Sequence, residues 1–466
     1  MFDIFTENEL DLLKTKVRRV LKDIGYKVEN EELSLLLKKK GLKLSSNGRF
    51  TFDDKIIDEF VSFQKKSQEK RKTIPKAERR RIYKTGFGNL ASKYYDYSTK
   101  RPLTAKKQHF EKLIKFAHQE DKIGGVSMPL SLTDIPLETA PIESFLMMVR
   151  LTNKYGYGIE PYSVRLIKYL VELSKVFLGE GCEDRFFDHC NCINPILRLE
   201  NRTAAVMLER AKYNITSLMT SMPTAGGNAP VTLDGVVIQG TAEIVGGLII
   251  SYLINPEAVL LGYISSSVMD FKTAVTSQST PESVLIDCGV VQLMDYDFGG
   301  KTSVGGTTYV AAREPGFKAV FEKMFKVIAY QKFLGRLSYG GAGILDNGSL
   351  ISPEQLVIDI EIGESFSYLS RKEMDDNNIE DVIAEVAKEG KGDFLSTEHT
   401  LKNFRNAFWE PFLFLRGSGT SEKEVLDRAH GIFNNKVKEY SGYDYDKDKI
   451  KAGEEILKRA KRELLV

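Results

Sequence analysis

The sequence has only four cysteines in 466 residues, and none of them belongs to a Cys-x-x-Cys pair. So few cysteines in so long a chain exclude a disulfide framework and are typical of reduced intracellular thiols. Neither sign of charge is in excess, because 66 Lys and Arg residues stand against 64 Asp and Glu residues. Any surface that recognises a charged partner must therefore be local. With 42% hydrophobic and 28% charged residues, the composition is that of a globular protein and excludes the disordered and collagen-like classes.

Export and membrane signals are also lacking. The first residues, MFDIFTENELDLLK, are acidic where a secretory signal has a basic start followed by an apolar run. The most apolar segment, Gly235–Ile254, is interrupted by Gln239 and Glu243, so it falls short of the ~18 uninterrupted apolar residues of a spanning helix. We interpret this segment as a buried helix of a barrel and expect a cytoplasmic protein without membrane contact.

The common catalytic signatures are missing as well: the G-x-x-x-x-G-K-[ST] phosphate loop, H-E-x-x-H and G-x-S-x-G. His189, Cys190 and Cys192 lie close together, and imidazole and thiolate are usual zinc ligands. On a strand, however, Cys190 and Cys192 share one face and His189 points to the other. We therefore expect no metal here and interpret the cysteines as pocket or core residues.

The first 64 or so residues read as a helical region. Thr6 and Glu9 have the spacing of a capping box, and apolar residues recur after them at helical spacing at Leu10, Leu13, Val17, Val20 and Leu21. The basic segment 65–84 follows, with ten Lys and Arg against two Glu. We interpret the basic segment as a solvated linker or arm. Docking of an acidic partner is the alternative, and binding of nucleic acid is the least favoured.

From about residue 105 the pattern changes to short apolar runs that end in small or polar residues, each followed by a helical pattern. Eight such runs begin at Gly124, Tyr155, Phe186, Asn214, Ala258, Thr302, Gly335 and Asp393. This alternation predicts an α/β fold, a (β/α)8 TIM barrel with an N-terminal helical extension and a C-terminal helical tail. The expected domains are a helical region with the basic linker (1–104), the barrel (105–415) and the tail (416–466). The tail should pack on the outside of the barrel or mediate self-association.

Four long segments carry a resemblance to a known family. They are FTENELDLLKTKVRRVLKDIGYKVENEE, SMPTAGGNAPVTLDGVVIQGTAEIVGGLI, GAGILDNGSLISPEQLVIDIEI and FLSTEHTLKNFRNAFWEPFLFLR, in this order along the chain. Together they resemble the trimethylamine methyltransferase family, which are corrinoid-dependent TIM-barrel enzymes. The resemblance is to members without pyrrolysine, which act on quaternary amines.

The resemblance implies transfer of a methyl group from a betaine-like quaternary amine to the cob(I)alamin of a partner corrinoid protein. No cofactor would then be tightly bound by this chain. A quaternary ammonium leaves as a neutral amine, so the reaction needs positioning and charge handling but no general acid, base or protein nucleophile. Catalytic residues are accordingly not assigned, and a homo-oligomer is expected. Two alternatives stay open: an enzyme of the same fold that methylates tetrahydrofolate directly, and a non-catalytic binding barrel.

Two departures from the resemblance concern the substrate. Tyr309 falls where the trimethylamine enzymes carry pyrrolysine, which argues against trimethylamine itself. The Ser-Asp-Ala-Lys that follows pyrrolysine in those enzymes is replaced here by Val310-Ala311-Ala312-Arg313. The loss of the acidic residue indicates an altered polarity and weighs against glycine betaine.

The substrate should lie at the carboxyl ends of the barrel strands, where residues from several distant runs meet. Two tyrosines would face an ammonium group through their rings, a glutamate would balance its charge, and Arg313 or His399 would hold a substrate carboxylate. The predicted substrate-binding residues are Glu160, Tyr162, Asn191, Ser221, Tyr263, Tyr309, Arg313 and His399.

Overall fold

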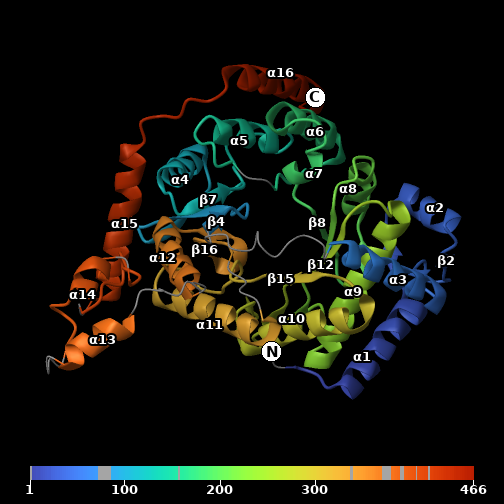
Figure 1. Cartoon of the computed structure of the whole chain (residues 1–466). Coiled ribbons are helices and arrows are strands. Elements are labelled where there is room, and N and C mark those ends of the chain that lie inside the picture. The colour runs from blue at the N-terminus through green and yellow to red at the C-terminus, as the bar shows by residue number, and fades with distance from the viewer. Residues whose placement is uncertain are drawn as a thin grey trace.

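The computed structural model describes residues 3–71, 85–155, 158–335, 340–369, 379–388, 393–405, 407–417 and 420–465 (Figure 1). The basic segment is therefore described only as far as Arg71. Its cluster of Arg79, Arg80 and Arg81 lies outside the described residues, and so does the docking role considered for it.

The N-terminal region is helical, as predicted. The Thr6 side chain accepts a hydrogen bond from the Glu9 amide, and the Glu9 carboxylate accepts one from the Thr6 amide, which completes the capping box. The buried side chains of Leu10, Leu13 and Val17 belong to a hydrophobic core shared with α9. The elements of this region are α1 (Glu7–Arg19), η1 (Val20–Ile24), β1 (Lys27–Val28), α2 (Glu31–Lys39), β2 (Lys43–Leu44), β3 (Phe50–Thr51) and α3 (Asp54–Arg71).

Strands of the central part run parallel and follow one another in chain order. The pair β4 (Thr85–Phe87) and β7 (Ile123–Val126) comes first. Single parallel bridges then join Val126 to Tyr155 and Ile159 to Phe187. A parallel four-stranded sheet completes the series, in the order β8 (Cys190–Cys192), β10 (Ser217–Ser221), β12 (Leu260–Ile264) and β15 (Thr302–Val304). The mixed α/β fold with parallel sheets is thus confirmed.

Helices surround these strands in a ring (Figure 1). They are α4 (Lys107–Gln119), α5 (Ala140–Val149), α6 (Val164–Leu178), α7 (Glu183–Phe186), α8 (Asn201–Ala211), α9 (Leu233–Ile254), α10 (Pro281–Leu293), η3 (Met294–Phe298), α11 (Phe317–Leu334) and α12 (Pro353–Leu369). Among the described residues, no pairing joins β15 back to β4. A closed eight-stranded barrel therefore stays a prediction.

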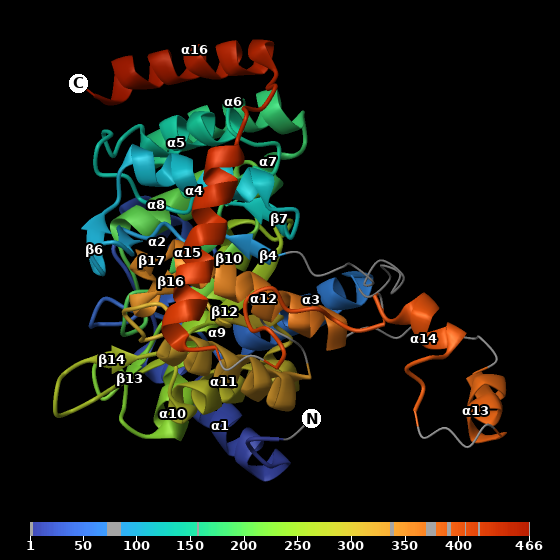
Figure 2. The ribbon, with the colours of Figure 1, turned by 90° about the vertical axis from the view of Figure 1, so that its left-hand side faces the viewer.

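The predicted series of eight strands differs from the structure at its beginning and at its end. The parallel series begins one unit earlier than predicted, at β4, because a three-residue strand beside the basic segment leaves no apolar run to recognise. The strand predicted at Asp393 is wrong: a turn occupies this position, and the Thr397 hydroxyl accepts from the Thr400 amide to begin α14 (Glu398–Asn403). Figure 2 shows α13 (Ile379–Lys388) and α14 projecting away from the ring. The run from Gly335 lies partly outside the described residues.

The long apolar segment predicted as a buried helix is α9. By length and composition it is the one described helix that could cross a membrane, but 83% of its most apolar window is buried inside the fold. It packs against α1, α10, β10 and β12, so its apolar residues form the centre of a core.

Small sheets lie in the loops around the strands. β5 (Lys93–Asp96) and β6 (Arg101–Thr104) form a sheet with β16 (Ile344–Leu345) and β17 (Leu350–Ile351), next to the short helix η4 (Asp346–Gly348). A second sheet joins loops that follow two neighbouring strands of the parallel sheet, through β11 (Thr224–Ala225), β13 (Ser267–Met269) and β14 (Thr276–Ser277), while β9 (Arg198–Leu199) pairs with β1.

The C-terminal tail packs on the outside, as predicted. Helix α15 (Glu422–Glu439) lies against α4 and α12, and α16 (Lys447–Leu464) lies against α5 and α6. Figure 2 shows α15 running along the outside of the ring and α16 across its top.

Candidate functional site

One face of the four-stranded parallel sheet is turned towards α9. The Ser221 hydroxyl donates a 2.6 Å hydrogen bond to the Glu243 carboxylate of α9, and both residues are fully buried. Met219 lies so close to Gly247 of α9 that a Cβ there would be 2.5 Å from the methionine methyl group. Because side chains alternate along a strand, the residues between these point the other way.

The opposite face looks into the centre of the helix ring. The strand register places Cys192, Thr220, Tyr263 and Ser303 side by side on this face. We call these four residues the lumen row. Cys192 and Ser303 are exposed and Tyr263 is half-buried, whereas the neighbours of the row on the α9 side are buried. The row is therefore open to solvent at Cys192 and Ser303, whereas Thr220 between them is buried.

Two tyrosines meet at the lumen row. Tyr309, in the loop after β15, lies near Tyr263, and each phenol acts on the pKa of the other. Its ring lies against Gly348, where a Cβ would be 2.8 Å from the ring and where φ is +94°. Burial raises the pKa of Tyr309 to about 12, with Cys190, Cys192 and Asp188 adding to the effect. Burial also raises the pKa of Tyr263 well above its usual value. Both phenols are therefore protonated at neutral pH.

Two carboxylates, Glu160 and Asp188, act on the pKa of Cys192 in the lumen row. Burial raises the pKa of Glu160, and the nearby Asp188 raises it further, while Arg202 and Arg210 act in the opposite sense. Asp188 is held in place by the Cys190 amide, which donates to its Oδ1 at 2.7 Å.

Tyr162 lies beside Glu160, and both line a small pocket whose other walls are largely apolar. Burial raises the pKa of this tyrosine, and Glu160 adds to the effect. The site thus combines aromatic rings with anionic groups.

The thiols of the site are not activated. Burial raises the pKa of Cys190 and of Cys192, and Asp188 raises both further, so neither thiol ionises readily at neutral pH. His189 faces away from them, with its Nε2 at 3.1 Å from Asp184 Oδ1. Within the described residues, no group of three or more His, Cys, Asp and Glu side chains is placed to hold a metal ion.

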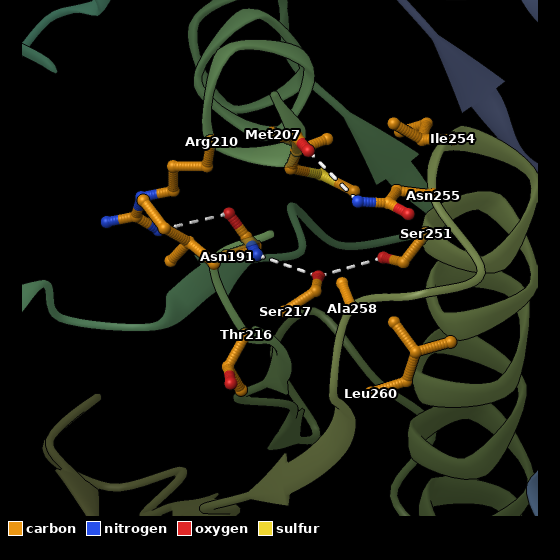
Figure 3. A pocket seen from close by; sticks show the side chains of 12 residues that line it. Asn191, Met207, Arg210, Thr216, Ser217, Ser251, Ile254, Asn255, Ala258 and Leu260 are labelled. Atoms are coloured by element: carbon orange, nitrogen blue, oxygen red, sulfur yellow. Dashed lines mark hydrogen bonds between the residues drawn. The ribbon is translucent and has the colours of Figure 1, made fainter. Parts of the chain in front are cut away.

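The structure places four of the eight predicted residues in two pairs: Tyr263 lies near Tyr309, and Glu160 lies near Tyr162. Asn191 does not join them, because it points from β8 towards the helices. Its amide donates to Ser217 Oγ at 3.0 Å, and its Oδ1 accepts from Arg210 at 3.4 Å (Figure 3). These residues line a separate small pocket between the sheet, α8 and α9.

The three remaining predicted residues also lie elsewhere. Ser221 is turned to α9, as described above. Arg313 has a side chain that is 69% exposed and pairs with Asp346 at 3.3 Å. His399 lies in the projecting helix α14, where its ring nitrogen is 3.2 Å from the Asn403 amide.

Asp188 was not selected from the sequence, and Cys190 and Cys192 were interpreted as pocket or core residues but not included among the substrate-binding residues. Because side chains alternate along a strand, Cys190 and Cys192 point to the face opposite to His189 and Asn191. This alternation is the sequence signal that could have placed the two cysteines in the site. The sequence gives no such signal for Asp188. Its side chain is positioned by the local hydrogen bond that its carboxylate accepts from the Cys190 amide.

Comparison with known proteins gives a consistent result over nearly the whole chain. The family model described as trimethylamine methyltransferase matches residues 1–464. The chain is similar to the trimethylamine methyltransferase MttB of Methanosarcina barkeri (24% identity over 98% of this chain and 95% of the relative). It is also similar to MttB of Desulfitobacterium hafniense (23% identity; 86% of this chain, 82% of the relative) and to the glycine betaine methyltransferase of the same species (22% identity; 94% of this chain, 93% of the relative).

Proposed function

Because the chain belongs to the trimethylamine methyltransferase family, it is a methyltransferase, and we propose that it takes the methyl group from a quaternary amine and passes it to the cob(I)alamin of a partner corrinoid protein. The observation that carries this proposal is that Tyr263 of the lumen row has Tyr309 near it, while Asp188 acts on the pKa of Tyr309 and both Glu160 and Asp188 act on that of Cys192 in the same row. Aromatic faces and carboxylates are the groups that attract a quaternary ammonium ion.

The residues of the site serve to bind and orient the substrate. The tyrosine rings would lie against the ammonium group, and Glu160 and Asp188 would balance its charge. When the carbon–nitrogen bond breaks, its electron pair stays on nitrogen and the product is a neutral tertiary amine, so no proton has to be moved. The protonated tyrosines and thiols do not compete for the methyl group.

The corrinoid, when it is delivered by its protein, would supply the nucleophile. The exposure of Cys192 and Ser303 supports this step, because the lumen row can be reached from solvent. Tyr309, at the position that resemblance assigns to pyrrolysine in the trimethylamine enzymes, supports a quaternary rather than a tertiary amine as the donor.

We also propose that the protein acts in the cytoplasm and as a homo-oligomer, with this chain itself binding no corrinoid tightly. Support for self-association comes from α11, whose large apolar side chains Phe317, Phe321 and Ile328 are exposed by 76%, 61% and 58%. Apolar residues grouped on a surface are typical of protein interfaces.

The test is methyl transfer to free cob(I)alamin. The purified protein is mixed with cob(I)alamin and a panel of quaternary amines, and the visible spectrum is followed for loss of cob(I)alamin. We expect loss with at least one donor and a slower reaction with the Tyr309→Ala variant. If no donor reacts but methylated tetrahydrofolate forms when tetrahydrofolate is supplied, the direct route is the correct one.

A further inference from the structure

The segment before Tyr309 is in contact with a second loop, residues 340–348. The Thr307 hydroxyl donates to the Gly340 carbonyl oxygen at 2.6 Å and accepts from the Gly340 amide at 3.0 Å. Gly341 has a φ of +64° and lies so close to Thr308 that a Cβ there would be 2.5 Å from the threonine Cα. No side chain fits between the two main chains, so a movement of the second loop would displace Thr308 and the residue after it.

The same loop holds Tyr309 itself and the residue after it. The Asn347 amide donates to the Val310 carbonyl oxygen at 2.7 Å. The Tyr309 ring lies against Gly348, where a Cβ would be 2.8 Å from the ring. The 340–348 loop thus contacts the tyrosine and the residues on both sides of it, so the place of the ring depends on the place of this loop.

A fully buried ion pair fixes the beginning of the 340–348 loop. Lys323 of α11 and Asp359 of α12 are both 0% exposed, and the lysine Nζ lies 2.5 Å from Asp359 Oδ2. The same carboxylate oxygen accepts from the Gly343 amide at 2.7 Å, and the lysine donates to the Gly341 carbonyl oxygen at 3.2 Å. Both charges are therefore bound to the main chain of the loop as well as to each other.

The hydrogen bonds to the loop give a reason for burying these two charges. A buried ion pair contributes little to stability, because the cost of removing two charges from water offsets their attraction. Hydrogen bonds from charged groups to main-chain atoms, by contrast, are strong and hold those atoms in one arrangement. Gln355, one turn before Asp359 on α12, donates to its Oδ1 at 2.8 Å and so fixes the direction of the carboxylate.

We propose that Lys323 and Asp359 are positioning residues, which hold the Tyr309 ring through the 340–348 loop in the orientation that receives the substrate cation. Neither residue contacts the substrate, and no proton or methyl group passes through them. The inference rests on the proposed function and adds to it two residues that act through Tyr309. Without the ion pair, the loop loses the attachment of its first residues, and the ring is free to adopt other orientations.

The first test removes both charges together. The double variant Lys323→Met/Asp359→Leu leaves no unpaired charge in the core, so we expect it to fold with a melting temperature close to that of the unmodified protein. Because the hydrogen bonds to the loop are lost, KM for the quaternary amine in methyl transfer to cob(I)alamin should rise about tenfold, while kcat should change less than about twofold. An unchanged KM in the folded double variant overturns the proposal.

Two single variants on the same helix separate positioning from stability. Asp359→Asn keeps the shape of the side chain, removes its charge and should raise KM several-fold. The matched control is Glu361→Gln, because Glu361 is also a buried carboxylate of α12 but accepts from the amides of Phe412 and Leu413, away from the 340–348 loop. The control should unfold at a lower temperature and keep its KM.

These single variants decide the question even if the double variant does not fold. A rise of KM in Asp359→Asn alone supports the positioning role. Equal values of KM in Asp359→Asn and Glu361→Gln, raised or not, show that the charge of Asp359 has no particular effect on the site and overturn the proposal.

Hydrogen exchange separates this inference from the proposed function, because it needs no reaction. In Asp359→Asn the amides of residues 305–313 and 340–348 should exchange at least about tenfold faster than in the unmodified protein, whereas those of α9 should be unchanged. Faster exchange of both loops, with no methyl transfer by the unmodified protein, overturns the function and retains the attachment of the loops by the ion pair. Unchanged exchange of both loops, with methyl transfer intact, overturns the inference and retains the function.

Discussion

The ammonium group of Lys326 donates a 2.9 Å hydrogen bond to the main-chain carbonyl oxygen of Tyr309. Lys326 is fully buried on α11, and burial lowers its pKa to about 8, against the opposing effect of Asp287 and Glu322. Asp287 is itself fixed by the Tyr330 hydroxyl at 2.8 Å and the Ser266 amide at 2.7 Å. The loop that carries Tyr309 is thus attached to α11 through a buried charge.

Removing this attachment should loosen Tyr309. We expect Lys326→Met to lower kcat/KM for methyl transfer about tenfold, because a hydrogen bond to a charged group is worth about 1.5–3 kcal/mol. Most of the loss should fall on KM, because in the proposed site the Tyr309 ring lies against the substrate cation. The matched control is Lys332→Met, an exposed lysine of the same helix, which should react as the unmodified protein does. A loss of kcat alone would contradict a positioning role.

The same lysine should make stability depend on alkaline pH. Its pKa is about 8 in the folded chain and near its usual 10.5 when unfolded, so between these values the unfolded chain holds a proton that the folded chain has released. Stability therefore rises with pH across this window. The measurement is the free energy of unfolding by denaturant, for the unmodified protein and for Lys326→Met. Between pH 7.5 and 9.5 we expect the unmodified protein to gain about 2 kcal/mol of stability relative to the variant. An unchanged difference would mean that the lysine titrates as if exposed.

Two replacements of Tyr309 should distinguish the contribution of its ring from that of its hydroxyl. Tyr309→Phe keeps the aromatic face and should change kcat/KM little, whereas Tyr309→Ala removes an attraction of about 0.5–2 kcal/mol. The measurement is the initial rate with cob(I)alamin at several donor concentrations. If Phe abolished turnover and Ala did no worse, the aromatic role would be wrong.

Cys192 should report on occupancy of the site. Cys192 can be reached from solvent, but its position inside the ring and the charges of Glu160 and Asp188 raise its pKa. Alkylation by iodoacetamide should therefore be slow near pH 7 and faster above pH 9, by ~tenfold per pH unit below the pKa. A saturating quaternary amine should suppress it. Peptide mass spectrometry distinguishes it from Cys288, which is buried and should stay unmodified in the folded protein. Labelling that no quaternary amine affects would place the ligand away from the lumen row.

Ser221 should matter for folding more than for substrate. Ser221→Ala leaves the buried Glu243 without one of its donors, which should cost about 1–3 kcal/mol of stability and leave KM unchanged. Thermal unfolding and donor titration together provide the check. The exposed Ser303→Ala on a nearby strand is the control for stability and should unfold at nearly the same temperature.

Parts of the architecture and the site could be predicted because they follow from local rules. The capping box at Thr6 and the apolar runs that form β10 and β12 depend on neighbours in the sequence, and these were recognised. Tyr263 was selected as an aromatic residue at the end of one of these runs. Asn191 shows the limit: its strand was recognised, but the face it occupies depends on where α8 and α9 pack.

The remaining differences come from interactions that sequence neighbours do not reveal. The run at Asp393 resembles a strand, yet the Thr397 cap starts a helix there. Arg313 was chosen for its charge, but its partner Asp346 lies 33 positions further along the chain and draws it to the surface. Lys326 was not selected at all, because a lysine in a helix is ordinarily exposed and only the fold buries it.

The position of α16 across α5 and α6 also sets an order of events during synthesis. Arg459 of α16 pairs with Glu172 of α6, 287 positions earlier, and Gly453 packs against Leu146 of α5. A ribosome that adds about 5–20 residues per second makes these early helices roughly 15–60 seconds before their cover exists. During that interval the outer apolar surfaces of α5 and α6 are available to chaperones, and these surfaces become covered only after α16 has emerged from the exit tunnel.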